Sequence, residues 1–118
     1  MSYNILFLVD KYDKSLEMGI VTPLREKFGD VVQEPLDSVD IGSLEANLIF
    51  LEKVADIDDR AFYQLVSRGI KTVIVSHALN IEDCVRYFKA GAFGYCEYSN
   101  LSGYESEIKD MSSRQNVK

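Results

Sequence analysis

Short apolar runs recur along this chain and alternate with segments of helical periodicity. This alternation restricts the possible folds more than any other feature of the sequence. Apolar runs occupy residues 4–9 (NILFLV), 48–51 (LIFL) and 72–75 (TVIV), and weaker ones occupy residues 31–34 and 93–97. Such runs are typical of strands buried on both faces of a parallel sheet. The order predicts a single α/β domain with a five-stranded parallel sheet between helices.

The segments between these runs predict helices. Residues 59–66 and 81–90 have apolar side chains at helical spacing, and residues 101–111 predict a last helix. Residues 36–46 carry a weaker helical pattern, which Gly42 interrupts.

The first helix has two alternative starts. In one, Thr22 is the N-cap and Pro23 the first helical residue. In the other, the helix begins near Asp13 or Ser15 and kinks at Pro23.

Length and charge exclude several classes of function. The chain has 118 residues, enough for one domain, which we place at residues 1–111 with a polar tail at 112–118. No apolar run approaches the roughly 18 residues of a membrane span, and the N-terminus lacks the features of a signal peptide. The net charge of -6 argues against binding of nucleic acid or an anionic membrane. We expect a cytoplasmic protein in which Cys84 and Cys96 are reduced.

Residues 71–100, KTVIVSHALNIEDCVRYFKAGAFGYCEYSN, read as a strand, a polar turn, an amphipathic helix, an Ala-Gly-Ala turn and a second strand. This segment resembles the C-terminal half of a response-regulator receiver domain, the phosphoacceptor module of bacterial two-component signalling. The resemblance covers the whole chain in element order and is specific from about residue 73 to residue 98. It implies a flavodoxin-like sheet with strand order 2-1-3-4-5.

The resemblance also implies a site at the carboxyl ends of the strands. The receiver positions are occupied here as follows: the acidic pair by Asp10 and Lys11, the phosphoacceptor by Glu52, the two switch residues by Ser76 and Tyr95, and the lysine by Tyr98. A lysine in the acidic pair opposes Mg²⁺ binding, glutamate moves the acceptor carboxylate, and tyrosine brings no positive charge. We therefore expect an atypical receiver, or pseudo-receiver, with no cofactor, no metal and no catalytic residue.

Several of these residues allow a second interpretation. Lys11 and Glu52 form an internal ion pair that replaces switchable phosphorylation, or they are two solvated side chains. Asp10 is a vestige of the acidic pair or a carboxylate that caps backbone N–H groups. Ser76 is a switch hydroxyl or a turn hydroxyl, and Tyr98 is also explained as a packed aromatic at the rim.

Asp56, Asp58 and Asp59 cluster before the helix predicted at residues 59–66. Carboxylates at this place stabilise a helix N-terminus, and the alternative is a displaced metal or phosphoacceptor site. His77 is the single histidine; it has no catalytic partner in the sequence and is interpreted as a turn residue.

In receivers, the face built from the fourth helix, fifth strand and fifth helix docks partners. The matching region predicts five partner-binding residues: Arg86, Lys89, Phe93, Tyr95 and Tyr104. Tyrosines there are also explained as a cover for the core. The partner implied is a protein: a kinase, an output domain or a second copy of the chain.

The sequence thus favours a receiver-like signalling module, not an enzyme, that acts through phosphorylation-independent protein contacts. One alternative is a phosphorylatable receiver with a non-standard acceptor. The other is a Rossmann-like protein that binds a small ligand, a reading suggested by residues 6–19, LFLVDKYDKSLEMG.

Overall fold

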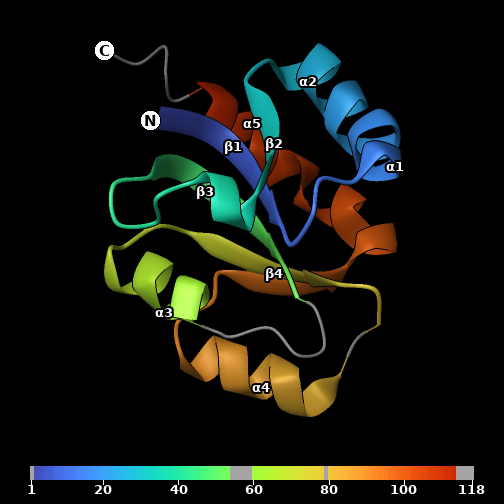
Figure 1. Ribbon diagram of the computed structural model, residues 1–118. Helices are drawn as coiled ribbons and strands as arrows, with labels where there is room; N and C mark the ends of the chain where they lie inside the picture. Colours follow the sequence, from blue (N-terminus) through green and yellow to red (C-terminus); the bar gives the residue numbers. More distant parts are fainter. Residues whose placement is uncertain (1, 54–59, 79, 114–118) are drawn as a thin grey trace.

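Five parallel strands form one sheet at the centre of the molecule (Figure 1). This computed structural model describes residues 2–53, 60–78 and 80–113. The strands are β1 (Ser2–Val9), β2 (Val31–Pro35), β3 (Glu45–Glu52), β4 (Thr72–Ser76) and β5 (Gly94–Glu97). Their order is β2-β1-β3-β4-β5. The predicted sheet and its flavodoxin-like order are confirmed.

Helices cover both faces of the sheet because the central strands bury side chains on both sides. One face packs against α1 (Lys14–Leu16), α2 (Thr22–Phe28) and α5 (Glu105–Ser113). The other face packs against α3 (Arg60–Ser67) and α4 (Ile81–Lys89). On the first face, Phe7 of β1 stacks on Phe50 of β3, with ring centroids 4.7 Å apart. Figure 1 shows the two groups of helices on opposite sides of the strands.

The first helical segment begins after Asp13, which settles the alternative that the sequence left open. Asp13 is the N-cap, and its carboxylate accepts a hydrogen bond from the Leu16 N–H. The segment continues through a π-helical stretch, Glu17–Val21, into α2. Pro23 has no N–H to donate to the preceding turn, and the widened π turn lies directly before it. Thr22 is therefore inside the helical segment and is not its N-cap.

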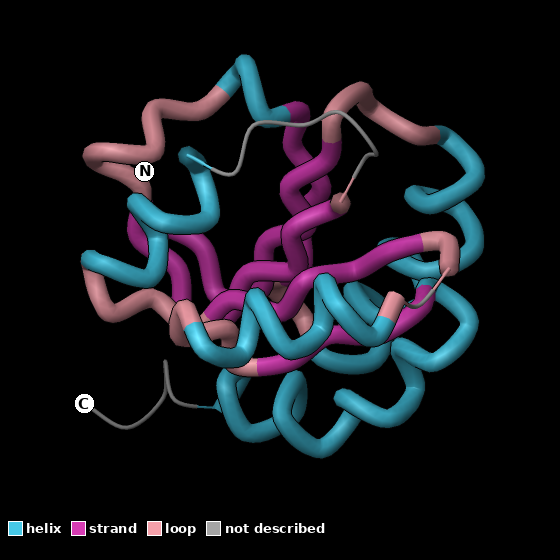
Figure 2. The backbone as a smooth tube through the Cα atoms, turned by 90° about the horizontal axis from the view of Figure 1, so that it is seen from below, coloured by secondary structure: helices cyan, strands magenta, loops and turns pink. Residues whose placement is uncertain are grey.

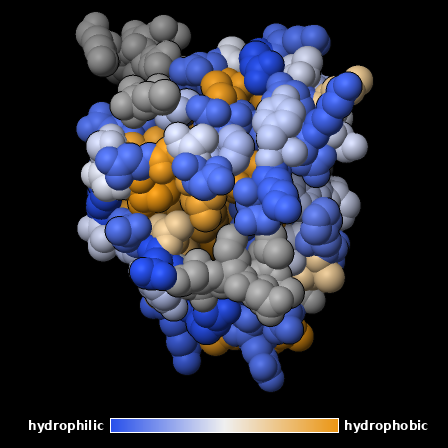
Figure 3. Space-filling model, in the orientation of Figure 1, coloured by the Kyte–Doolittle hydropathy of each residue, from blue (hydrophilic) through white to orange (hydrophobic). Residues whose placement is uncertain are grey.

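The connection between β2 and β3 has much less helix than its sequence pattern suggested. It contains a 3₁₀ turn, Leu36–Ser38, and Figure 2 shows the rest as loop. Its hydrophobic side chains (Leu36, Val39, Ile41 and Leu44) pack against the same face as α3 and α4. In Figure 3, apolar atoms reach the surface in a hollow over β3 and this connection.

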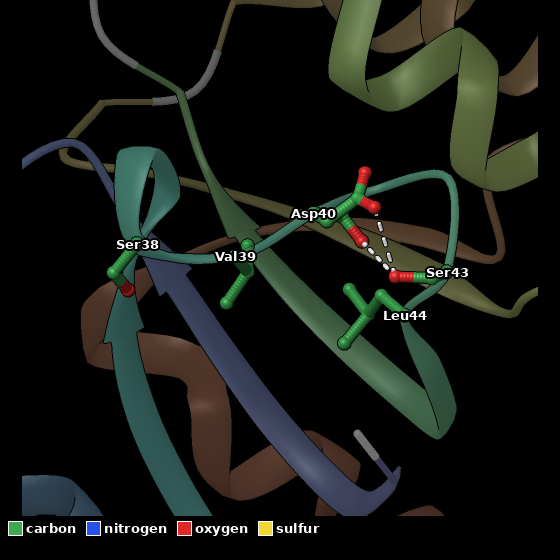
Figure 4. Close-up of a pocket in the computed structure, with 5 residues that line it drawn as sticks. All are labelled: Ser38, Val39, Asp40, Ser43 and Leu44. Atoms are coloured by element: carbon green, nitrogen blue, oxygen red, sulfur yellow. Dashed lines mark hydrogen bonds between the residues drawn. The ribbon is translucent and has the colours of Figure 1, made fainter.

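The connection keeps its shape through polar contacts. Asp40 accepts hydrogen bonds from the Gly42 N–H and the Ser43 hydroxyl, at 3.1 and 3.0 Å. Asp40 and Ser43 line a pocket of about 210 Å³ together with Ser38, Val39 and Leu44. Figure 4 shows Val39 and Leu44 pointing away from the Asp40 carboxylate. Arg68, just after α3, donates from its guanidinium to the carbonyls of Ile41 and Leu44. Local turns and one distant arginine therefore hold a segment that has no long helix.

The last helix extends to Ser113, two residues beyond the domain boundary expected at residue 111. Residues 114–118, most of the expected tail, lie outside the described part of the chain. Among the described residues, no helix is long and apolar enough to cross a membrane.

Candidate functional site at the carboxyl edge of the sheet

Four of the predicted site positions lie together at the carboxyl edge of the sheet. Asp10 follows β1, Glu52 ends β3, Ser76 ends β4 and Tyr98 follows β5. Because parallel strands all end at the same edge, strand endings far apart in sequence become neighbours. The geometry at this edge decides what each side chain can do.

The Glu52 carboxylate has a hydrogen-bond donor on each oxygen. Its Oε2 accepts a hydrogen bond from the Tyr98 hydroxyl at 2.7 Å, and its Oε1 accepts one from the backbone N–H of Asp10 at 3.0 Å. β4 lies between β3 and β5, so the bond to Tyr98 passes over the end of a strand. One side chain thus ties together the ends of β1, β3 and β5.

Tyr98 is the first residue of a 3₁₀ helix, Tyr98–Tyr104, that follows β5. Burial raises the pKa of its phenol, and the hydrogen bond to the Glu52 carboxylate raises this pKa further. Ionisation would place two negative oxygens in contact, so the phenol stays protonated at neutral pH and acts as a donor. Its ring lies against the His77 ring, with centroids 4.8 Å apart and planes 41° apart.

Lys11 does not form the predicted ion pair with Glu52. Its side chain is exposed, and neither a hydrogen bond nor an ion pair joins it to Glu52 within the described residues. The Tyr98 hydroxyl takes the place beside the carboxylate that the ammonium was expected to take. A neutral donor satisfies Glu52 without the cost of removing an ammonium from water. Of the two alternatives for Lys11, the solvated side chain is the one observed.

The described residues at this edge do not fit the divalent cation that receiver chemistry uses. Asp10 is exposed, its neighbour Lys11 is a cation, and both oxygens of Glu52 already accept hydrogen bonds. Hard dications need several free oxygen ligands. Nowhere in residues 2–53, 60–78 and 80–113 do three metal-ligating side chains come together. The alternative of a displaced site rests on Asp56, Asp58 and Asp59, which lie outside these ranges.

The two switch positions are both engaged within the domain. The Ser76 hydroxyl donates to the Ala78 carbonyl at 2.9 Å and accepts from the Ala78 N–H at 3.3 Å, which is the geometry of a turn hydroxyl. Tyr95 is 9% exposed, and its ring stacks on Tyr87 at a centroid distance of 6.0 Å. Its buried hydroxyl has no hydrogen-bond partner among the described residues.

The predicted partner-binding residues divide into two groups. Arg86, Lys89 and Phe93 are exposed, and the Lys71 ammonium lies 5.1 Å from the centre of the Phe93 ring. Tyr95 and Tyr104 are packed into the domain instead.

Tyr104 packs edge-to-face on Phe50, at a centroid distance of 5.9 Å. Its hydroxyl lies so close to Gly94 that a Cβ on that glycine would be 2.0 Å away. Tyrosine rings bring a large apolar area to a core, which explains why both tyrosines serve the core here.

An exposed apolar row on α4 did not emerge from the sequence pattern. Ile81 is 83% exposed, Val85 47% and Phe88 48%. Their spacing of four and three residues predicts a core-facing stripe. The side chain that α4 buries is Tyr87, which packs edge-to-face on Phe62 of α3 at 5.0 Å. Tyr87 lies about a third of a turn around the helix from the row. This offset was the feature of the sequence that could have indicated that the row does not face the core.

The comparisons with known proteins identify the fold. No protein-family model matches the chain, and neither does any curated protein sequence. Solved structures do match. A response regulator receiver domain (CheY-like) from Methanospirillum hungatei JF-1 has a TM-score of 0.67 and 20% identity over 98% of each chain.

Two further structures support the same assignment. A two-component response regulator from Clostridium difficile has a TM-score of 0.66 and 16% identity over 96% of this chain and 98% of its own. The beryllofluoride-activated DrrB receiver domain has a TM-score of 0.65 and 17% identity over 94% and 97%. The chain therefore has the fold of these receiver domains.

Proposed function

We propose that this chain is a receiver-like signalling module that works through phosphorylation-independent contacts with a protein partner. The observation that carries the proposal is the double hydrogen bonding of Glu52, at the position where a receiver presents its phosphoacceptor. One oxygen accepts from Tyr98 and the other from the Asp10 N–H.

Phosphoryl transfer to a carboxylate needs a free oxygen as nucleophile and cations that neutralise the transferred charge. At this edge the lysine position holds Tyr98, whose raised pKa keeps it neutral. One acidic-pair position holds Lys11, which is exposed and forms no ion pair with Glu52 within the described ranges. A phosphoryl group on Glu52 would displace two hydrogen bonds, and no cation among the described residues is paired with Glu52 to replace them. These arguments favour a fixed site over a phosphorylatable one.

The bridge at Glu52 joins the ends of β1, β3 and β5 in one arrangement. A switch needs two arrangements whose populations a ligand or modification can change. With an internal carboxylate in place of the phosphoryl group, the edge keeps one arrangement. The surfaces of the domain are then presented in the same form at all times.

The row Ile81, Val85 and Phe88 is the surface that best suits a protein partner, and Phe93 is a further exposed apolar side chain in the turn after α4. All four side chains are between 39% and 83% exposed and come from α4 and the turn that follows it. Clustered apolar side chains on a small soluble domain mark interaction sites. Arg86 and Lys89 lie on the same helix, and Lys71 covers the Phe93 ring. Aromatic and apolar anchors with a polar rim are typical of protein interfaces.

The deciding experiment is a two-dimensional amide NMR titration with Mg²⁺ and then beryllofluoride, an analogue of a phosphoryl group. We expect the resonances of Asp10, Glu52, Ser76 and Tyr95 to stay in place at 10 mM Mg²⁺. A matched control restores the receiver residues with Lys11→Asp, Glu52→Asp and Tyr98→Lys. Shifts in the control alone support the proposal. Saturable shifts in the native chain contradict it and favour a working acceptor site.

A further inference from the structure

We propose that a pocket beside Tyr98 binds a small organic cation, an amine or guanidine carried on an apolar body. The pocket has a volume of about 220 Å³ and is lined by Asp13, Ser15, Leu16, Ile20, His77 and Tyr98. The proposal does not depend on the function proposed above, because none of these residues has to react.

Three distant parts of the chain form the pocket. Asp13 to Ile20 belong to the first helical segment, His77 follows β4, and Tyr98 follows β5. The pocket therefore lies at the carboxyl edge of the sheet, where open α/β sheets place their ligands. It is a separate feature from the Glu52 carboxylate, which is not among its lining residues.

The walls of the pocket are apolar on one side and aromatic on the other. Leu16, Ile20 and Tyr98 belong to or pack against the core between the sheet and the first helix. The His77 and Tyr98 rings lie 4.8 Å apart, and Tyr98 is held by its hydrogen bond to Glu52. A ligand body can thus contact aliphatic and aromatic surface without rearrangement of the core.

Charge selects a cation for this pocket. Among the described residues that line the pocket, Asp13 is the single carboxylate, and none is a lysine or an arginine. Oδ1 of Asp13 accepts the hydrogen bond that caps the helix, from the Leu16 N–H at 3.1 Å, and Oδ2 accepts none from a residue in the described ranges. Aromatic rings also attract cations through their negative faces. An anion would meet this carboxylate with no compensating charge in the lining.

Asp13 is held in place by a buried side chain. Gln33 is 4% exposed; its Oε1 accepts from the Asp13 N–H at 2.7 Å and its Nε2 donates to the Asp13 carbonyl at 3.1 Å. Because the N–H and the carbonyl of Asp13 are both held, its carboxylate loses little conformational freedom when it pairs with a ligand. The position is therefore preorganised for a charged group.

The test uses benzylamine as the cationic probe and benzyl alcohol as its neutral counterpart, both followed by two-dimensional NMR. For a ligand of this size we expect a Kd on the order of 1 mM. Benzylamine should shift the resonances of Ser15, His77 and Tyr98, and benzyl alcohol should bind at least about tenfold more weakly. The variant Asp13→Asn keeps a good N-cap but removes the charge, and we expect it to weaken benzylamine binding about tenfold.

A free amine and the arginine side chain of another protein share this chemistry, and Nα-acetyl-arginine amide distinguishes them. Tighter binding of this compound than of benzylamine would identify a protein side chain as the natural ligand, and the reverse order a small molecule. Equal binding of benzylamine and benzyl alcohol, or no shift at His77 and Tyr98 with 20 mM benzylamine, overturns the proposal. Unchanged benzylamine affinity in a folded Asp13→Asn variant also overturns it.

Discussion

At the scale of single residues, the pair of Glu52 and Tyr98 determines the character of the carboxyl edge. The bond between them joins positions 46 residues apart in sequence and has a donor–acceptor distance of 2.7 Å. A hydrogen bond to a charged group contributes more to stability than one between neutral groups. This pair is a structural contact between the end of β3 and the segment that follows β5.

We expect Tyr98→Phe to lower the free energy of unfolding by about 1–2 kcal/mol, because Glu52 loses the donor on Oε2 while the ring keeps its packing. Urea denaturation measures the change. Lys11→Ala is the matched control at the same edge, since its side chain is exposed and should change stability by less than about 0.5 kcal/mol. A larger effect for Lys11→Ala than for Tyr98→Phe would restore the ion-pair hypothesis.

Stability should also fall at alkaline pH. The pKa of a tyrosine is about 10 in an unfolded chain, and that of Tyr98 is raised in the fold. Above pH 10 the unfolded chain loses the proton that the folded protein retains, so the stabilisation present below pH 10 decreases as the pH rises. Tyr98→Phe should flatten this decrease between pH 10 and 11, whereas Tyr63→Phe, on an exposed ring, should not. Equal slopes for both variants would contradict the assignment.

At the scale of elements, the β2–β3 connection differs most from a helix-covered sheet. One 3₁₀ turn and an Asp40-centred loop cover this part of the sheet. The guanidinium of Arg68 reaches two carbonyls of this loop from the end of α3. Both hydrogen bonds come from Nη1, whose two N–H donors are held in the plane of the guanidinium and therefore point in fixed directions.

Arg68→Lys should therefore loosen the connection although the charge is kept. We expect a loss of about 1 kcal/mol in unfolding free energy, and faster hydrogen exchange at Ser43 and Leu44, whose N–H groups donate to Asp40. Ser67→Ala is a neighbouring control that leaves these carbonyl contacts intact. Unchanged exchange at both amides in Arg68→Lys would show that the arginine does not hold the loop.

At the scale of the whole molecule, the domain combines a fixed carboxyl edge with an exposed apolar row on α4. The core lies in two layers, one on each face of the sheet. The row belongs to neither layer: Ile81, Val85 and Phe88 remain exposed while Tyr87 of the same helix is buried. The helix is therefore anchored by Tyr87, with the partly buried Cys84 packed against the same core, and presents a separate apolar flank.

Replacement of this flank should abolish association without unfolding the domain. We expect Phe88→Glu and Ile81→Glu to change the free energy of unfolding by less than about 1 kcal/mol, because both side chains are solvated. Sedimentation velocity of the native chain tests a second copy as partner, and cross-linking in cells tests other proteins. Tyr63→Glu, at an exposed position on α3, is the control. If Phe88→Glu keeps every association with other protein molecules that the native chain makes, the row is not an interface.

The apolar runs predicted the parallel sheet and the strand-end positions of Asp10, Glu52, Ser76 and Tyr98, and the resemblance to receiver domains implied the strand order. Apolar runs specify buried strands, and short connections leave few topologies. Tertiary structure decided which donor Glu52 meets and which side of α4 is buried. The donors to Glu52, the Tyr98 hydroxyl and the Asp10 backbone N–H, are both more than forty residues away in sequence, so these contacts depend on how the strands are placed in space. Periodicity reports the direction of a side chain along its own element, and only packing between elements selects its partner.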